Sequence, residues 1–151
     1  MKKSNTITLF LLLAVTLPLF SQSSPTAILE IKFTGIRSNK GLVAIGMNKN
    51  PDGWPRKPHM EHNWKKTNLA EGVFTAKLEN LAYGTYAISV LDDENSNLEM
   101  EMFMGIPKEG WGFSMNPPFK LSAPDFEDCS FVLNKPFMQI TIDLRYAGKG
   151  R

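Results

Sequence analysis

Short runs of residues that alternate between apolar and polar side chains recur along this chain, each closed by Gly, Pro, Asn or Ser. In residues 27–34 (AILEIKFT), Ile or Leu alternates with charged residues, and Ile140, Ile142 and Leu144 alternate with polar residues in the same way. A period of two residues places one set of side chains on one face of a β-strand. After residue 21 no apolar repeat of helical period runs for three turns. The pattern therefore predicts an all-β chain.

The pattern predicts six or seven short strands. We expect a single domain of about seven strands. They fit a β-sandwich, in which each of two sheets buries one face, with a closed barrel as the alternative. The first two predicted strands are expected to form a hairpin through the turn at residues 35–41. The clearest predicted strands cover residues 27–34, 42–47, 74–78, 85–91, 130–133 and 138–146.

Two long stretches, residues 48–69 and 92–128, carry no such pattern and are expected to be loops. Long loops inside a compact domain are commonly functional or disordered. These two contain all three tryptophans of the chain, and large rings of this kind bury much area. We therefore expect ordered loops that carry the function.

The N-terminus has the three parts of an export signal. Two lysines follow Met1, residues 7–20 are mostly apolar, and Ser21 supplies a small residue for cleavage. The apolar run is shorter than the ~20 residues that a membrane-spanning helix needs. We expect residues 1–21 to be a cleaved signal peptide. Residues 22–151 then form one exported domain, periplasmic or extracellular, that is not embedded in the membrane.

Removal of the signal peptide brings the net charge to zero, because Lys2 and Lys3 leave with it and the other 15 basic residues balance 15 acidic ones. This balance and the exported compartment predict no nucleic-acid partner. The single cysteine, Cys129, cannot form a disulfide within the chain, so we interpret it as a buried apolar residue. Stability is expected to come from packing.

Oxygen-bearing side chains alternate after residue 92, as they do in calcium-binding loops. Leu98 stands where such a loop has glycine, and Met104 stands where it has a bidentate glutamate. The alternative is an Asx-rich turn whose side chains bond their own backbone. Calcium is the candidate cofactor. Its candidate ligands are Asp93, Asn95, Asn97, the backbone carbonyl of Glu99, and Glu101.

Met100, Met102 and Met104 also alternate, which in a strand would place three thioethers on one face. Thioethers select Cu(I), and His59 and His62 in the other long loop could add imidazoles. Core packing is the alternative for a methionine stripe. A periplasmic copper-handling protein is therefore the second functional hypothesis.

The candidate binding surface for a protein or carbohydrate ligand comprises Trp111, Phe113 and Glu109, because large aromatic rings dominate contact energy at binding sites. The three tryptophans could form an aromatic platform, or they could staple the loops.

The segment around Ser114, residues 112–116, lacks the second glycine of a nucleophile elbow. The sequence therefore predicts a non-catalytic, exported binding or structural module, with an uncharacterised hydrolase as the third hypothesis.

Four segments of the chain are similar to a known family. They are residues 81–87 (LAYGTYA), 92–97 (DDENSN), 105–114 (GIPKEGWGFS) and 124–128 (PDFED). Together they resemble the bacterial family of unknown function called DUF2141. The resemblance implies an exported immunoglobulin-like or transthyretin-like β-sandwich with no established activity, and it places Tyr86 at a strand corner. The family's acidic loop usually reads D-E-N-G-N-G-x-L-D, and this chain lacks both glycines.

Overall fold

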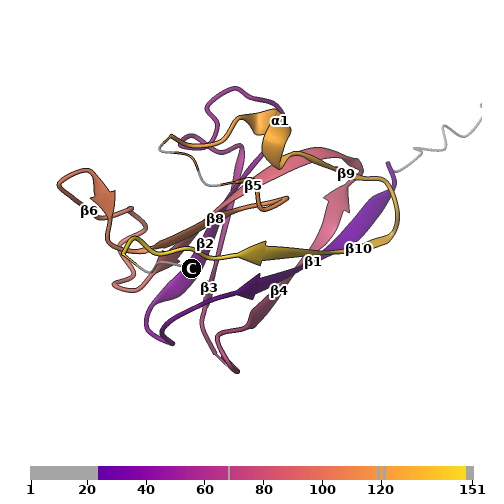
Figure 1. The fold of residues 1–151 in the computed structure, drawn as a ribbon. Helices are drawn as coiled ribbons and strands as arrows, with labels where there is room; N and C mark the ends of the chain where they lie inside the picture. The colour runs from indigo at the N-terminus through magenta and orange to yellow at the C-terminus, as the bar shows by residue number, and fades with distance from the viewer. Residues whose placement is uncertain (1–23, 68, 119, 121, 149–151) are drawn as a thin grey trace, which may run out of the picture.

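The chain is all-β, as the alternating pattern predicts. The computed structural model describes residues 24–67, 69–118, 120 and 122–148, and these form ten strands and one helix of four residues (Figure 1). Within these ranges no helix is long and apolar enough to cross a bilayer. The predicted signal peptide, residues 1–21, lies outside them.

One sheet has three strands in the order β10-β1-β4. Its central strand β1 (Thr26–Thr34) runs parallel to β10 (Phe137–Asp143) and antiparallel to β4 (Phe74–Ala82). The side chains of β1 alternate between solvent and core, as the period of two residues predicts. Those that face the core are Ala27, Leu29, Ile31 and Phe33.

The second sheet has five strands, in the order β3-β2-β5-β8 with β9 also paired to β5. The longest strand, β5, lies between β2 and β8 and ends at Asp93. The acidic loop, residues 93–101, begins at this end of the strand. The bounds are β2 (Leu42–Asn48), β3 (Met60–Lys65), β5 (Gly84–Asp93), β8 (Gly110–Phe113) and β9 (Phe131–Leu133).

A separate two-stranded hairpin, β6 (Met102–Phe103) and β7 (Ile106–Pro107), follows the acidic loop. Figure 1 shows it extending away from the two larger sheets. The backbone N–H of Lys108 donates to the carbonyl of Glu101 at 2.9 Å and closes the base of the hairpin. This element is therefore an ordered projection.

Three local predictions are wrong. The loop expected over residues 92–128 contains the strands β6, β7 and β8. β1 and β2 do not form a hairpin, because they lie in different sheets. Residues 35–41 instead carry the chain from one sheet to the other, and alternation within each strand cannot distinguish these two connections. Residues 60–65, expected to be part of a loop, form β3, which pairs with β2 at the edge of its sheet. Most side chains of β3 are exposed on both faces, so it shows no period of two.

The two larger sheets bury one shared apolar cluster, to which strands of both contribute. Tyr86, at the start of β5, is buried, and its hydroxyl donates a hydrogen bond to the carbonyl of Ala82 at 2.7 Å. This bond spans the corner between β4 and β5, so the position implied for Tyr86 by the family resemblance is confirmed.

A smaller cluster forms where helix α1 (Phe126–Cys129) covers β5. Cys129 is a fully buried free thiol in this cluster, and burial raises its pKa to about 12. A thiol that keeps its proton in an apolar setting is unreactive. The interpretation of Cys129 as a buried apolar residue is confirmed.

Candidate functional site

The acidic loop, residues 93–101, is held by hydrogen bonds from its own backbone. Asp93 is fully buried, and its carboxylate accepts N–H groups of Asn97 at 3.1 Å and Leu98 at 2.9 Å. The side-chain oxygen of Asn95 accepts the N–H of Asn97 at 3.0 Å, and that of Asn97 accepts the N–H of Glu99 at 2.8 Å. The bonds of Asn95 and Asn97 are Asx turns. Three of the proposed calcium ligands therefore already accept backbone donors.

The exposed side of the loop is also internally paired. The Asn95 amide donates to the Glu101 carboxylate at 3.0 Å, and the Lys108 ammonium lies 2.8 Å from the same carboxylate. Across the residues that the structure describes, no group of three or more Asp, Glu, His or Cys side chains is arranged to hold a metal ion. A calcium ion would have to displace these donors.

We expect the melting temperature to be the same in millimolar calcium and in excess chelator, because the Asx turns already satisfy the loop oxygens. Thermal unfolding followed by circular dichroism measures this. A melting temperature that rises with calcium would show instead that Asp93, Asn95 and Asn97 rearrange around the ion.

Glu109 connects the two ends of the acidic loop to β8. It is only 4 % exposed, and its carboxylate accepts the backbone N–H groups of Glu94 at 3.1 Å and Glu101 at 3.4 Å. Burial raises its pKa. Although sequence places Glu109 on the binding surface, its carboxylate faces the backbone of the loop and supports it from within.

A buried polar cluster adjoins the start of the loop. The side chains of Lys66 and Asp92 are both fully buried, with 2.5 Å between Nζ and Oδ1. The Tyr146 hydroxyl donates to the other oxygen of Asp92 and accepts the backbone N–H of Arg37 at 3.1 Å. Burial raises the pKa of Tyr146, so the phenol keeps its proton. Sequence reasoning missed this cluster, because a lysine in a polar run gives no sign of burial.

Arg37 links the buried cluster to the acidic loop. Its guanidinium makes two hydrogen bonds to the Glu94 carboxylate, at 2.6 and 3.0 Å, and lies 4.5 Å from the centroid of the Tyr146 ring. A further guanidinium N–H donates to the carbonyl of Lys108 at 3.0 Å. The hydrogen bond from Arg37 lowers the pKa of Glu94. Arg37 thus holds the segment before the β6–β7 hairpin, at Glu94, and the segment after it, at Lys108.

The hairpin itself is apolar and exposed. Phe103 is 65 % exposed and Met104 is 86 % exposed. Met104 and Gly105 form the turn with φ of +48° and +79°. Of the nine large apolar side chains that are exposed within the described residues, five lie in this region: Leu98, Met102, Phe103, Met104 and Ile106. Exposed apolar side chains that gather in one region are typical of contact surfaces in proteins.

The three methionines do not share a strand face. β6 covers only Met102 and Phe103, and Met104 lies in the turn, so the strand expected across Met100 to Met104 is interrupted. The thioether-bearing side chains of Met102 and Met104 are exposed. The two candidate histidines are on or beside β3, which Figure 1 shows apart from the hairpin.

The aromatic residues of the long loops pack into separate clusters. Phe113 on β8 packs against Trp54, whose indole N–H donates to the carbonyl of Pro124 at 2.9 Å. Trp64 instead packs against Phe33 of the main core. Trp111 is partly buried, and its backbone pairs with that of Arg145. The rings staple loops to the sheets and do not form one platform.

Ser114 is fully buried and bonded to backbone. Its hydroxyl accepts the N–H of Ile88 at 2.8 Å and donates to the carbonyl of Cys129 at 2.5 Å. These bonds join β5 to Cys129, the last residue of α1. The hydroxyl therefore serves the fold.

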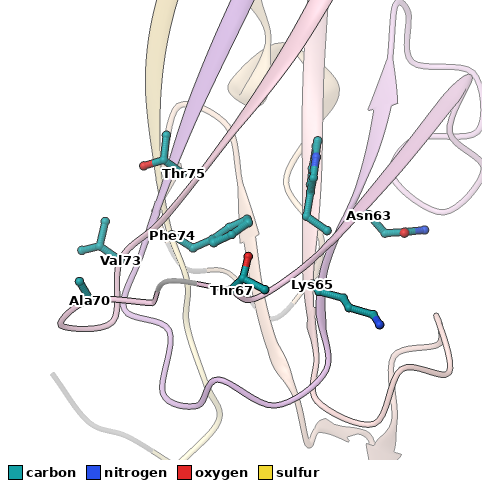
Figure 2. A pocket seen from close by; sticks show the side chains of 8 residues that line it. Asn63, Lys65, Thr67, Ala70, Val73, Phe74 and Thr75 are labelled. Atoms are coloured by element: carbon teal, nitrogen blue, oxygen red, sulfur yellow. The ribbon is translucent and has the colours of Figure 1, made fainter.

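An open depression of about 750 Å³ lies between the ends of β3 and β4. Figure 2 shows Asn63 and Lys65 of β3 along one side, with Val73 and Phe74 on the other. None of its eight lining residues is Asp, Glu, His, Cys or Ser. Lys65 is the one titratable residue in this lining.

A family model described as "Uncharacterized protein conserved in bacteria (DUF2141)" matches residues 31–141. The matched region includes the acidic loop and the β6–β7 hairpin. No curated protein and no solved structure matches the chain.

Proposed function

The chain belongs to the DUF2141 family of bacterial proteins, and we propose that it is an exported, non-catalytic binding module that contacts another protein through the β6–β7 hairpin. The export signal read from residues 1–21 supports the exported location. The two sheets around a shared core support an immunoglobulin-like or transthyretin-like β-sandwich. In such folds, loops at one end carry the binding function.

The exposed apolar tip of the hairpin carries this proposal. Phe103 and Met104 gain free energy when they leave water, at about 25 cal/mol per Å² of apolar surface. The large side chains that the tip exposes are apolar and lack the donors and acceptors that sugar hydroxyls need. An apolar pocket on a second protein matches this chemistry better than a carbohydrate does.

The base of the hairpin is fixed before any partner binds. Glu109 bonds both ends of the acidic loop, and Arg37 bonds Glu94 and the carbonyl of Lys108. A contact element that is already ordered loses less conformational entropy on binding. The acidic loop is therefore proposed to be the rigid support of the contact surface.

A second candidate function, Cu(I) handling, is favoured by the exposure of Met102 and Met104. Substitution of Met100, Met102 and Met104 by leucine separates the two functions, because leucine keeps the apolar surface and lacks sulfur. We expect protein contact to survive this triple substitution and Cu(I) binding to be lost with it.

A photo-crosslinking amino acid in place of Phe103 tests the proposal in a bacterium that makes the protein. The matched control carries it in place of Phe137, an aromatic residue of β10 that is 51 % exposed. We expect a discrete protein adduct from position 103 that position 137 does not give, and we expect it to persist in the triple leucine variant. Lack of an adduct, together with stoichiometric Cu(I) binding by the wild-type protein, would favour the copper function.

A further inference from the structure

The contact between Lys66 and Asp92 joins two segments that are not neighbours in the sheet. Lys66 follows β3, Asp92 lies near the end of β5, and β2 runs between these strands. The Nζ and Oδ1 atoms are 2.5 Å apart, and neither side chain is exposed. We propose that these two residues become joined by an intramolecular amide bond after folding.

Complete burial favours a neutral product at this site. Removing an ammonium and a carboxylate from water costs several kcal/mol per ion, and their attraction offsets this only when further hydrogen bonds satisfy both groups. An ammonium has three donors. Among the described residues, Asp92 is the one hydrogen-bond partner of Lys66 Nζ. An amide removes both charges and leaves one N–H.

Tyr146 is placed to assist the reaction. Its hydroxyl donates to Oδ2 of Asp92, the carboxylate oxygen that does not face the amine. The backbone N–H of Arg37 and the guanidinium above the ring hold the phenol in this position. A hydrogen-bond donor on Oδ2 stabilises the negative charge that this oxygen acquires when nitrogen attacks the carboxyl carbon.

The reaction needs no cofactor or oxidant. A proton passes from the Lys66 ammonium to the Asp92 carboxylate, which gives a neutral amine and a carboxylic acid. The amine nitrogen then bonds to Cγ, with negative charge on Oδ2 beside Tyr146. Oδ1 leaves with two hydrogens as water, and the amide C=O and N–H remain. Because neither side chain is exposed, bulk water has little access to hydrolyse the product.

Peptide mapping of the denatured protein tests the bond directly. Trypsin does not cut after an acylated lysine, so we expect one branched species in which residues 66–77 are joined to residues 78–108. Its mass is expected to be the sum of the two peptides less one water. Recovery of residues 67–77 and 78–108 as separate peptides would overturn the proposal.

Variants identify the reacting groups. Lys66→Arg keeps a cation and cannot form the amide, so the branched species is expected to vanish. If the peptide of residues 78–108 still loses one water in this variant, the dehydration occurs at an aspartate without Lys66 and contradicts the proposal. Lys65→Arg, at the exposed neighbouring position, is the matched control and retains the branched species. Tyr146→Phe is expected to slow its appearance after refolding. An unchanged rate would contradict the role of the phenol.

Discussion

Lys66→Met is expected to lower the free energy of unfolding by about 3–5 kcal/mol, because it leaves the Asp92 carboxylate fully buried without its partner. The loss is expected whether the two side chains form an ion pair or an amide, since the variant has neither. Chemical denaturation followed by circular dichroism gives the free energy.

The control for this variant is Lys65→Met, which changes an exposed side chain one residue earlier. It is expected to stay within about 0.5 kcal/mol of the wild-type protein. An unfolding midpoint for Lys66→Met equal to that of the control would contradict the buried pairing of Lys66 with Asp92.

Gly41→Ala is expected to destabilise the fold by roughly 2–5 kcal/mol, from a left-handed backbone and a steric overlap. Gly41 has φ of +72°, and a Cβ atom there would lie 1.8 Å from the backbone oxygen of Asp93. The acidic loop would have to move away from β2 to make room. Denaturant unfolding measures the loss.

Gly105→Ala separates these two contributions. Gly105 has a similar φ of +79°, but a Cβ atom there would meet nothing within 4 Å. Only the backbone strain applies, so the expected cost is about 1–2 kcal/mol. Equal losses in the two variants would show that close packing of Gly41 on the acidic loop contributes nothing.

The fold class could be read from sequence because β1 has an unambiguous period of two residues. The partners of each strand could not. β1 and β2 are both half-buried strands separated by a short turn, and the same local pattern suits a hairpin or a crossing between sheets. β3 was missed because its edge position exposes most of its side chains, so backbone pairing with β2 defines it.

The candidate site shows a similar division. The Asp and Asn spacing predicts a turn-rich loop, and the Asx turns of Asn95 and Asn97 are present. The buried pair could not be predicted from sequence, because Lys66 contacts Asp92 only when β3 and β5 lie in one sheet. The hairpin turn was also missed, since Met104 adopts a positive φ that is uncommon for a non-glycine residue.

Photo-crosslinking at position 103 with added competitor decides whether the β6–β7 hairpin is a contact surface. Excess purified wild-type protein is expected to suppress the adduct, and a competitor that carries Phe103→Ser and Met104→Ser is expected to leave it intact. An adduct that both competitors suppress equally, or one that also forms from position 137, would contradict the role of the hairpin.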